Sequence, residues 1–160
     1  MTENMIEVSI PGHKVLRLTH LVIDYHGTLA CDGLLLPGVA STLEGLLDRM
    51  ELHVMTADIF GKAQSQMLGI PHHFEKLDPD NQATAKRDYV KALGSESTVC
   101  IGNGRNDRMM LAEAALGIVV VQEEGAAVEA IEQADMNCTD AVGALKLLTN
   151  TRRLMATLRS

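Results

Sequence analysis

The sequence is short of aromatic side chains and of long apolar runs. It has no tryptophan and only 2% aromatic residues, so its core has to be built from aliphatic side chains and methionine. No stretch approaches the roughly 18 apolar residues that a membrane-spanning helix needs, and the N-terminus lacks a basic start followed by an apolar run. We therefore expect a soluble, unexported protein that binds no membrane.

Cysteine is also scarce. Cys31, Cys100 and Cys138 are odd in number, widely spaced and without a C-x-x-C pair. This pattern suggests neither a disulfide framework nor a zinc site, and it fits a reducing cytoplasmic location.

Positive charge is in the minority, with 14 Lys and Arg against 21 Asp and Glu, for a net charge of -7. Nucleic acids and anionic membranes require clustered cations, so we expect no nucleic-acid partner. The basic cluster at Arg152, Arg153 and Arg159 is explained by a solvated face of the last helix. Any phosphate pocket therefore has to be local.

The 160 residues match the length of one domain, and we expect a single domain over 1–160. Pro11-Gly12 between two short apolar runs predicts a hairpin within 1–19, and the end of the chain, 140–160, predicts one long helix. Between them, apolar strands alternate with segments of helical periodicity. This order predicts an α/β fold, a doubly wound parallel sheet with helices on both faces. The helices are expected at 39–50, 58–68, 81–93, 107–115 and 126–133.

The stretch Asp24-Tyr25-His26-Gly27-Thr28-Leu29 carries most of the functional signal. Asp24 ends the apolar run 21–23 and precedes a glycine turn. Parallel sheets bind ligands just beyond their carboxyl ends, which is where a nucleophile belongs. A cap or turn residue is the alternative for Asp24 alone. Thr56 and Asn103 also follow predicted strands, and three such placements favour a site.

Three more segments follow in order: Met55-Thr56-Ala57-Asp58, Lys86 in a predicted helix, and Gly102-Asn103-Gly104-Arg105-Asn106-Asp107. With the first stretch they resemble the D-K-T-G-T-L, T-G-D and G-D-G-x-N-D motifs of P-type ATPase phosphorylation domains, which belong to the haloacid dehalogenase (HAD) superfamily. The chain most resembles the soluble P-type ATPase-like group. Only 31 residues separate Asp24 from Thr56, which leaves no room for a nucleotide-binding or cap domain. The resemblance therefore implies a capless core.

The resemblance also implies roles. Asp24 would attack phosphorus and form an aspartyl-phosphate. Thr56, with the backbone N–H of Ala57 at the start of a helix, would hold the phosphoryl oxygens, and Asn106 would orient them. Lys86 would neutralise charge in the site. The alternatives are a helix-entry role for Thr56 and a solvated lysine at position 86, with Arg87 and Lys91 as nearby rivals.

Mg²⁺ is the cofactor that the resemblance implies. Asp107 would ligate it together with Asp24, the backbone carbonyl of His26 and the side chain of Asn103. Asp107 could also be the cap of the helix that follows it.

Two residues depart from the family pattern. His26 stands where most HAD phosphatases carry a second Asp, and Asn103 stands where a carboxylate is usual. Imidazole can exchange protons near pH 7, so His26 could support hydrolysis. The leading hypothesis is a Mg²⁺-dependent phosphohydrolase acting on a phosphorylated small molecule or macromolecule. The alternative is a catalytically weak phosphate-binding or regulatory protein, and ATP-driven phosphotransfer is disfavoured without a nucleotide domain.

Family analogy also suggests a homo-oligomer.

Two further sequence patterns do not indicate a binding site. His72 and His73 are adjacent, and neighbouring strand residues point to opposite faces, so we interpret them as turn or surface residues. Gly102 and Gly104 lack the full dinucleotide-binding fingerprint.

Overall fold

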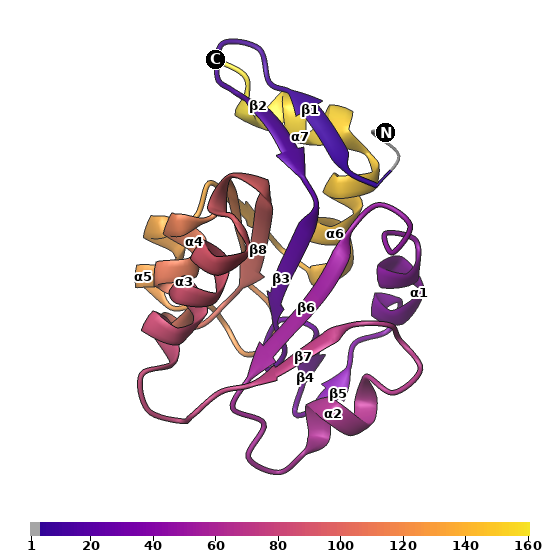
Figure 1. Ribbon diagram of the computed structural model, residues 1–160, viewed down its shortest axis with the longest axis vertical. Helices are drawn as coiled ribbons and strands as arrows, with labels where there is room; N and C mark the ends of the chain where they lie inside the picture. The colour runs from indigo at the N-terminus through magenta and orange to yellow at the C-terminus, as the bar shows by residue number, and fades with distance from the viewer. Residues whose placement is uncertain (1–3) are drawn as a thin grey trace.

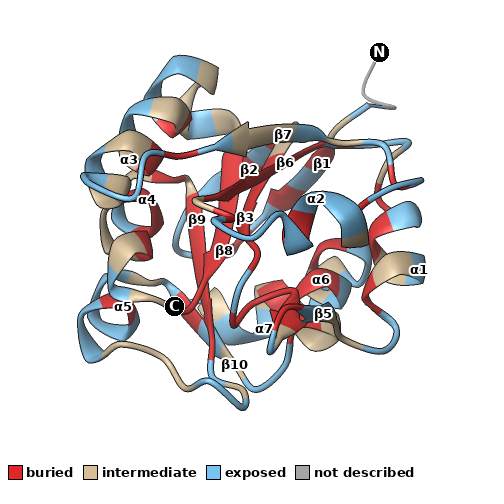
Figure 2. Ribbon diagram, turned by 90° about the horizontal axis from the view of Figure 1, so that it is seen from below, coloured by how far each residue is buried: buried red, intermediate tan, exposed pale blue. Residues whose placement is uncertain are grey.

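The computed structural model describes residues 4–160, so the first three residues of the predicted 1–19 segment lie outside it. Its centre is a six-stranded parallel sheet in the order β10-β9-β8-β3-β6-β7; Figure 1 shows β8, β3, β6 and β7, and Figure 2 shows β9 and β10. The strands are β3 (His20–Asp24), β6 (Glu51–Thr56), β7 (His73–Lys76), β8 (Thr98–Gly102), β9 (Leu116–Val120) and β10 (Met136–Cys138). The predicted α/β parallel sheet is confirmed.

Helices cover both faces of this sheet, and alternate strand residues face the two layers. On one face, Val22 and Met55 pack in a core with α3 (Gln82–Leu93), α4 (Arg108–Glu113) and α5 (Val128–Gln133). On the other, Ile23 and Val54 pack in a larger core with α1 (Val39–Glu44), α2 (Lys62–Gln66), α6 (Ala141–Thr149) and α7 (Thr151–Leu158). The four inner strands, β9, β8, β3 and β6, are consequently buried along most of their length (Figure 2).

Two small hairpins flank the first central strand. The first joins β1 (Ile6–Ser9) to β2 (Val15–Leu18) in antiparallel register. The second joins β4 (Ala30–Cys31) to β5 (Leu34–Leu35) just after Asp24, and sequence reasoning missed it. Its turn is Asp32-Gly33, with φ of 52° and 85°. Asp-Gly with two positive φ angles is the preferred two-residue hairpin turn, so the signal was present in the sequence.

The predicted helix bounds were wrong in three places. The helix expected over 58–68 covers only Lys62–Gln66, because positive φ angles at Asp58 (42°) and Gly61 (71°) interrupt a helical path. The helix expected over 39–50 ends at Glu44, before Gly45. The terminal helix is two helices, broken at Asn150 with φ −116° and ψ 68°.

Between β3 and β6 the chain forms only the β4–β5 hairpin and α1, and no cap domain is inserted there. Within residues 4–160, none of the helices has the length and apolar character needed to span a bilayer.

The sheet also buries His53, whose side chain is 3% exposed in β6. Burial, with His73 and His20 alongside, lowers the pKa of His53 to about 4. Unfolded histidine titrates near 6.5, so between these values the unfolded chain binds a proton that the folded protein does not. We expect the free energy of unfolding to decrease by about 2 kcal/mol from this group as pH falls through that window, allowing for solvent screening.

Denaturant titrations at pH 7 and pH 4.5, in the presence of EDTA, measure this effect. The decrease should be smaller in His53→Gln than in the wild type and unchanged in His13→Gln, which alters an exposed histidine. An equal decrease in all three proteins would contradict the assignment.

Candidate active site

The three polar residues predicted at strand ends meet at one edge of the sheet. Asp24 ends β3, Thr56 ends the neighbouring β6, and Asn103 follows β8 on the other side. The chain adds β6 and β7 on one side of β3 and then passes to the other side of β3 to form β8. Asp24 therefore lies where the strand order reverses, which is where parallel sheets bind ligands. A cavity of about 470 Å³ opens there, lined by six of the predicted residues: Asp24, His26, Thr56, Ala57, Asn103 and Asn106.

Lys86 lies behind Asp24 and links it to Asp107. Its Nζ donates to Asp24 Oδ1 at 3.0 Å and to Asp107 Oδ1 at 2.7 Å, and its side chain is fully buried. Lys86 and Val90 are one turn apart on α3 and form the buried face of this helix. The structure brings Lys86 to Asp24 and leaves the two rival cations elsewhere, Arg87 on Asp88 and Lys91 near Glu113.

Asp107 is held on its other side by the loop after β8. Its Oδ2 accepts the backbone N–H groups of Asn103 at 3.0 Å and Gly104 at 2.9 Å. Although Asp107 is the residue before α4, its side chain makes no bond to the first turn of that helix. It also does not line the cavity. The observed role of Asp107 is to orient Lys86 and the loop, and metal ligation by Asp107 stays a prediction.

Negative charge exceeds positive charge in this buried group. Burial, together with repulsion from Asp107, raises the pKa of Asp24 to about 7 despite the opposing effect of Lys86. Burial by itself lowers the pKa of Lys86, but the combined attraction of Asp107 and Asp24 is larger. The net effect raises the pKa of Lys86, so the amine stays charged. One cation therefore faces two carboxylates, and an added positive ion would relieve the excess.

Two of the residues that line the cavity here, Asp24 and Asn103, carry side-chain oxygen atoms that can bind a metal ion. Asp24 Oδ2 accepts a long hydrogen bond of 3.4 Å from the Thr28 hydroxyl, which lies 3.0 Å from Asn103 Oδ1. Asn103 is fixed by its Nδ2, which donates to the Gly125 carbonyl at 3.0 Å. Gly27 (φ 79°) permits this packing, because a Cβ there would lie 2.4 Å from Asn103 Nδ2. This oxygen donor set suits a hard cation such as Mg²⁺.

Thr56 is buried at the end of β6, where its hydroxyl accepts the backbone N–H of Asp58 at 3.2 Å. The expected helix directly after Thr56 is absent, since α2 begins only at Lys62. The backbone N–H of Ala57 therefore does not lie at a helix N-terminus, and the argument from helix geometry and dipole does not apply to it.

His26 is 43% exposed at the cavity, and its Nε2 lies 3.7 Å from Asp58 Oδ1. Asp58 is itself fixed, because its carboxylate accepts the backbone N–H groups of Ala63 at 2.7 Å and Gln64 at 3.2 Å. In the sequence Asp58 was only the last residue of the second motif and the first residue of an expected helix. The structure adds a carboxylate placed to orient the imidazole.

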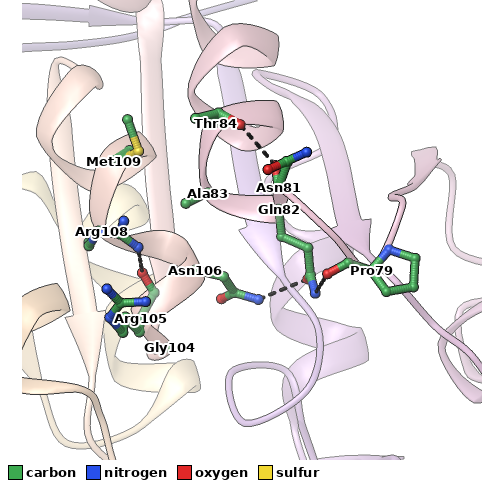
Figure 3. Close-up of a pocket in the computed structure, with 10 residues that line it drawn as sticks. All are labelled: Pro79, Asn81, Gln82, Ala83, Thr84, Gly104, Arg105, Asn106, Arg108 and Met109. Carbon is green, nitrogen blue, oxygen red and sulfur yellow. Dashed lines mark hydrogen bonds between the residues drawn. The ribbon is translucent and has the colours of Figure 1, made fainter.

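The mouth of the cavity holds residues that sequence reasoning did not single out. Ile59 and Phe60 lie on its rim and are 67% and 89% exposed. Gln82 accepts a hydrogen bond from Asn106 Nδ2 at 2.9 Å. Both Gln82 and Asn106 also line a neighbouring cavity of about 580 Å³ that carries two arginines, Arg105 and Arg108 (Figure 3). The two cavities adjoin, so the site extends beyond Asp24.

No protein-family model matches this chain. An uncharacterized protein of Methanocaldococcus jannaschii is 43% identical over 91 residues, a match that covers 98% of that protein and 52% of this chain.

Several solved structures with the same fold are described as phosphatases or hydrolases. The 3-deoxy-D-manno-octulosonate 8-phosphate phosphatase of Moraxella catarrhalis, in complex with a magnesium ion, a phosphate ion and KDO, is 18% identical with a TM-score of 0.67, covering 89% of this chain and 94% of that one. The cobalt-bound phosphatase of Haemophilus influenzae has a TM-score of 0.69 at 15% identity, covering 89% and 90%. A Legionella pneumophila protein assigned to HAD subfamily III A has a TM-score of 0.68 at 17% identity, covering 88% and 87%.

Proposed function

Because the chain belongs to one family with the Methanocaldococcus jannaschii protein and has the fold of HAD hydrolases, we propose that it is a Mg²⁺-dependent phosphohydrolase that acts through an aspartyl-phosphate at Asp24. The observation that carries this proposal is the buried Asp24–Lys86–Asp107 group at the edge of the cavity. Lys86 pairs with Asp24 Oδ1, and among the described residues Oδ2 has no ion-pair partner, so we assign the attack to Oδ2.

In the first step Asp24 Oδ2 forms a bond to phosphorus and the ester P–O bond breaks. The leaving oxygen takes a proton from His26 or from water. In the second step a water molecule attacks phosphorus, His26 accepts its proton, and the bond between Asp24 and phosphorus breaks to release inorganic phosphate. Mg²⁺, with Asp24, Asn103, Asp107 and the His26 carbonyl as its proposed ligands, would supply neutralisation of the phosphoryl charge.

The remaining predicted residues bind the phosphoryl group in this proposal. Thr56 and the N–H of Ala57 contact its oxygens from β6, and Asn106, held by Gln82, does so from the opposite loop. Lys86 acts through Asp24, since it is completely buried.

Hydrolysis of a generic aryl phosphate with Mg²⁺, and its loss in EDTA, tests the proposal. The competing function is a phosphate-binding or regulatory protein, favoured by His26 and Asn103 at positions where family members carry carboxylates. Under that alternative, beryllofluoride raises the thermal-unfolding temperature while no phosphate ester is hydrolysed at a measurable rate.

The proposed proton carrier can be tested separately. We expect His26→Ala to slow release of phosphate from the aspartyl-phosphate about 100-fold, because general acid–base catalysis contributes about 10²–10⁴. Asp58→Asn should slow it less, since Asp58 acts through His26. Quenched-flow measurement of phosphoenzyme decay gives both rates, and His13→Ala is the matched control. Decay at the wild-type rate in His26→Ala would exclude this role.

The finer assignments belong to the same proposal. The substrate is a phosphorylated small molecule or macromolecule, and a cavity with an apolar rim and two nearby arginines favours one that reaches beyond its phosphate. Membership of the soluble P-type ATPase-like group, a single domain over 1–160, a cytoplasmic location and homo-oligomerisation stay predictions. Exposed Phe60 and Ile59 are the apolar surface that a second subunit could cover.

A further inference from the structure

A cluster of histidine and glutamate side chains lies at the edge of the sheet opposite Asp24. His20, Glu51 and His73 are the first residues of β3, β6 and β7, and His53 lies two residues into β6. Side chains alternate along a strand, so Glu51 and His53 share a face. The register pairs His20 with Glu51 and His53 with His73, which brings all four side chains to the face covered by α3.

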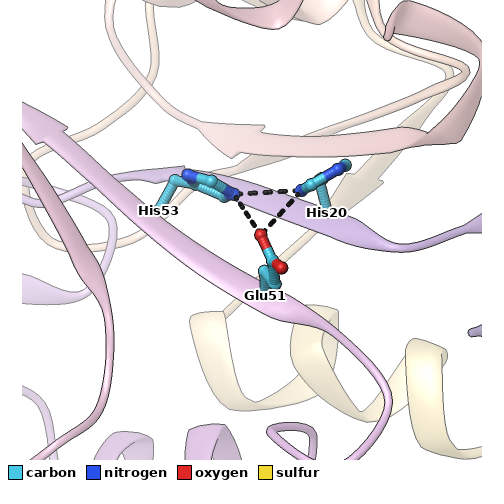
Figure 4. Close-up of side chains that lie close together, drawn as sticks. All are labelled: His20, Glu51 and His53. Carbon is cyan, nitrogen blue, oxygen red and sulfur yellow. Dashed lines mark hydrogen bonds and ion pairs between the residues drawn. The ribbon is translucent and has the colours of Figure 1, made fainter. Parts of the chain in front are cut away.

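Three ligand atoms in this cluster already have the spacing of a metal site. His20 Nδ1 lies 3.1 Å from His53 Nε2 and 3.5 Å from Glu51 Oε2, and the last two atoms are 3.9 Å apart (Figure 4). Two donors that each lie about 2.1 Å from a tetrahedral zinc ion are about 3.4 Å apart. The observed separations scatter around this value, so small side-chain movements would place an ion between the three atoms.

A hydrogen bond to helix α3 holds the His53 ring in place. The other ring nitrogen of His53, Nδ1, lies 2.7 Å from the hydroxyl of Tyr89 on α3. A hydrogen bond on the far nitrogen of a metal-binding histidine fixes its ring and tautomer. With a metal ion on Nε2, the Nδ1–H of His53 would donate to the Tyr89 hydroxyl.

The charges around this cluster and its exposure to solvent both permit a metal ion to bind. Within residues 4–160, the Glu51 carboxylate has ion-pair contacts only with histidines and none with lysine or arginine. A surface cavity of about 330 Å³ is lined by His20 and Glu51. An ion can therefore reach His20 and Glu51 from solvent without displacing a lysine or an arginine.

We propose that His20, Glu51 and His53 form a site for Zn²⁺ or a similar transition-metal ion, separate from the catalytic Mg²⁺. Two imidazoles and one carboxylate favour such ions over Mg²⁺, which prefers oxygen ligands. The fourth position is left to water or to His73, whose Nε2 lies 3.6 Å from the same Glu51 oxygen. The ion would join the amino-terminal ends of β3 and β6, beside the start of the neighbouring strand β7.

Metal titration of the whole protein tests the site. Protein stripped with EDTA and dialysed is titrated with Zn²⁺ in excess Mg²⁺ against a chromophoric chelator. We expect one Zn²⁺ per chain, and binding weakened by about tenfold or more in His20→Gln and in Glu51→Gln. His72→Gln, a neighbouring histidine outside the cluster, and Asp24→Asn, in the catalytic group, should bind Zn²⁺ as the wild type does.

Cobalt gives an independent readout. Co²⁺ in a tetrahedral nitrogen and oxygen site absorbs strongly in the visible region, and this band should appear in the wild type and disappear in Glu51→Gln. Circular dichroism checks that each variant is folded. Because the Glu51 side chain is exposed, we expect Glu51→Gln to fold as the wild type does. Equal Zn²⁺ affinity in the wild type, His20→Gln and Glu51→Gln, or no Zn²⁺ bound at micromolar concentration, would overturn the proposal.

Discussion

Asp24→Asn is expected to remove phosphatase activity almost completely, with kcat reduced at least about 1,000-fold, because an amide is a poor nucleophile and the covalent route is lost. Steady-state hydrolysis of an aryl phosphate with Mg²⁺ measures the loss, and acid quenching measures the missing phosphoenzyme. Residual activity near the wild-type level in the purified variant, with contaminating phosphatase excluded, would disprove the covalent role of Asp24.

The same variant should keep its stability. Asp24, Lys86 and Asp107 carry two negative charges and one positive charge in a buried space, and repulsion from Asp107 is one of the causes that raise the Asp24 pKa. Replacing Asp24 with Asn leaves the balanced pair of Lys86 and Asp107, joined at 2.7 Å. We therefore expect an unfolding temperature equal to or above that of the wild type. Exposed Asp48→Asn is the control and should change neither activity nor stability.

Lys86→Met is expected to have the largest effect on stability. It fills the same space but leaves two buried carboxylates without a cation, and breaking a buried pair in this way costs about 3–5 kcal/mol. Denaturant unfolding at pH 8 measures the loss. Lys91→Met, which removes an exposed lysine from the same helix, should stay within about 0.5 kcal/mol of the wild type.

The dependence on pH identifies the cause. Without Lys86 the two carboxylates repel each other with no cation between them, so the pKa of Asp24 in the folded state, which is already raised, rises further above its unfolded value. A carboxyl group with a raised pKa stabilises the fold at low pH and loses that contribution as pH increases. Lys86→Met should therefore be closest to the wild type near pH 5, and a second change, Asp107→Asn, should restore part of its stability at pH 8. A deficit independent of pH would point to packing instead of charge.

The inner strands were predictable because a sheet covered on both faces makes β3, β8 and β9 largely apolar runs. The β3 run and the polar residue that ends it, Asp24, can be read directly from the sequence. Helix bounds were less predictable. Asp58 is a good capping residue, and its carboxylate does accept two N–H groups of α2, but it does so from four residues before the helix because its φ is positive.

The candidate site was partly readable for the same reason. In a parallel sheet the carboxyl ends of all strands lie at one edge, so Asp24, Thr56 and Asn103 could be placed together from the sequence alone. Lys86 could be proposed only from the family motif, because a lysine on a helix shows nothing of its burial. The contact between His26 and Asp58 could not be predicted, since it depends on the path of an irregular loop.

By itself the sequence determined the alternation of strands and helices and the edge at which the polar residues gather, because both follow from local periodicity and turn chemistry. Only the tertiary structure decided which charges pair in the interior, and it directed Asp107 to Lys86. It alone also assembled His20, Glu51 and His53, because His20 lies about 30 positions before the other two residues in the sequence and meets them only through the pairing of β3 with β6.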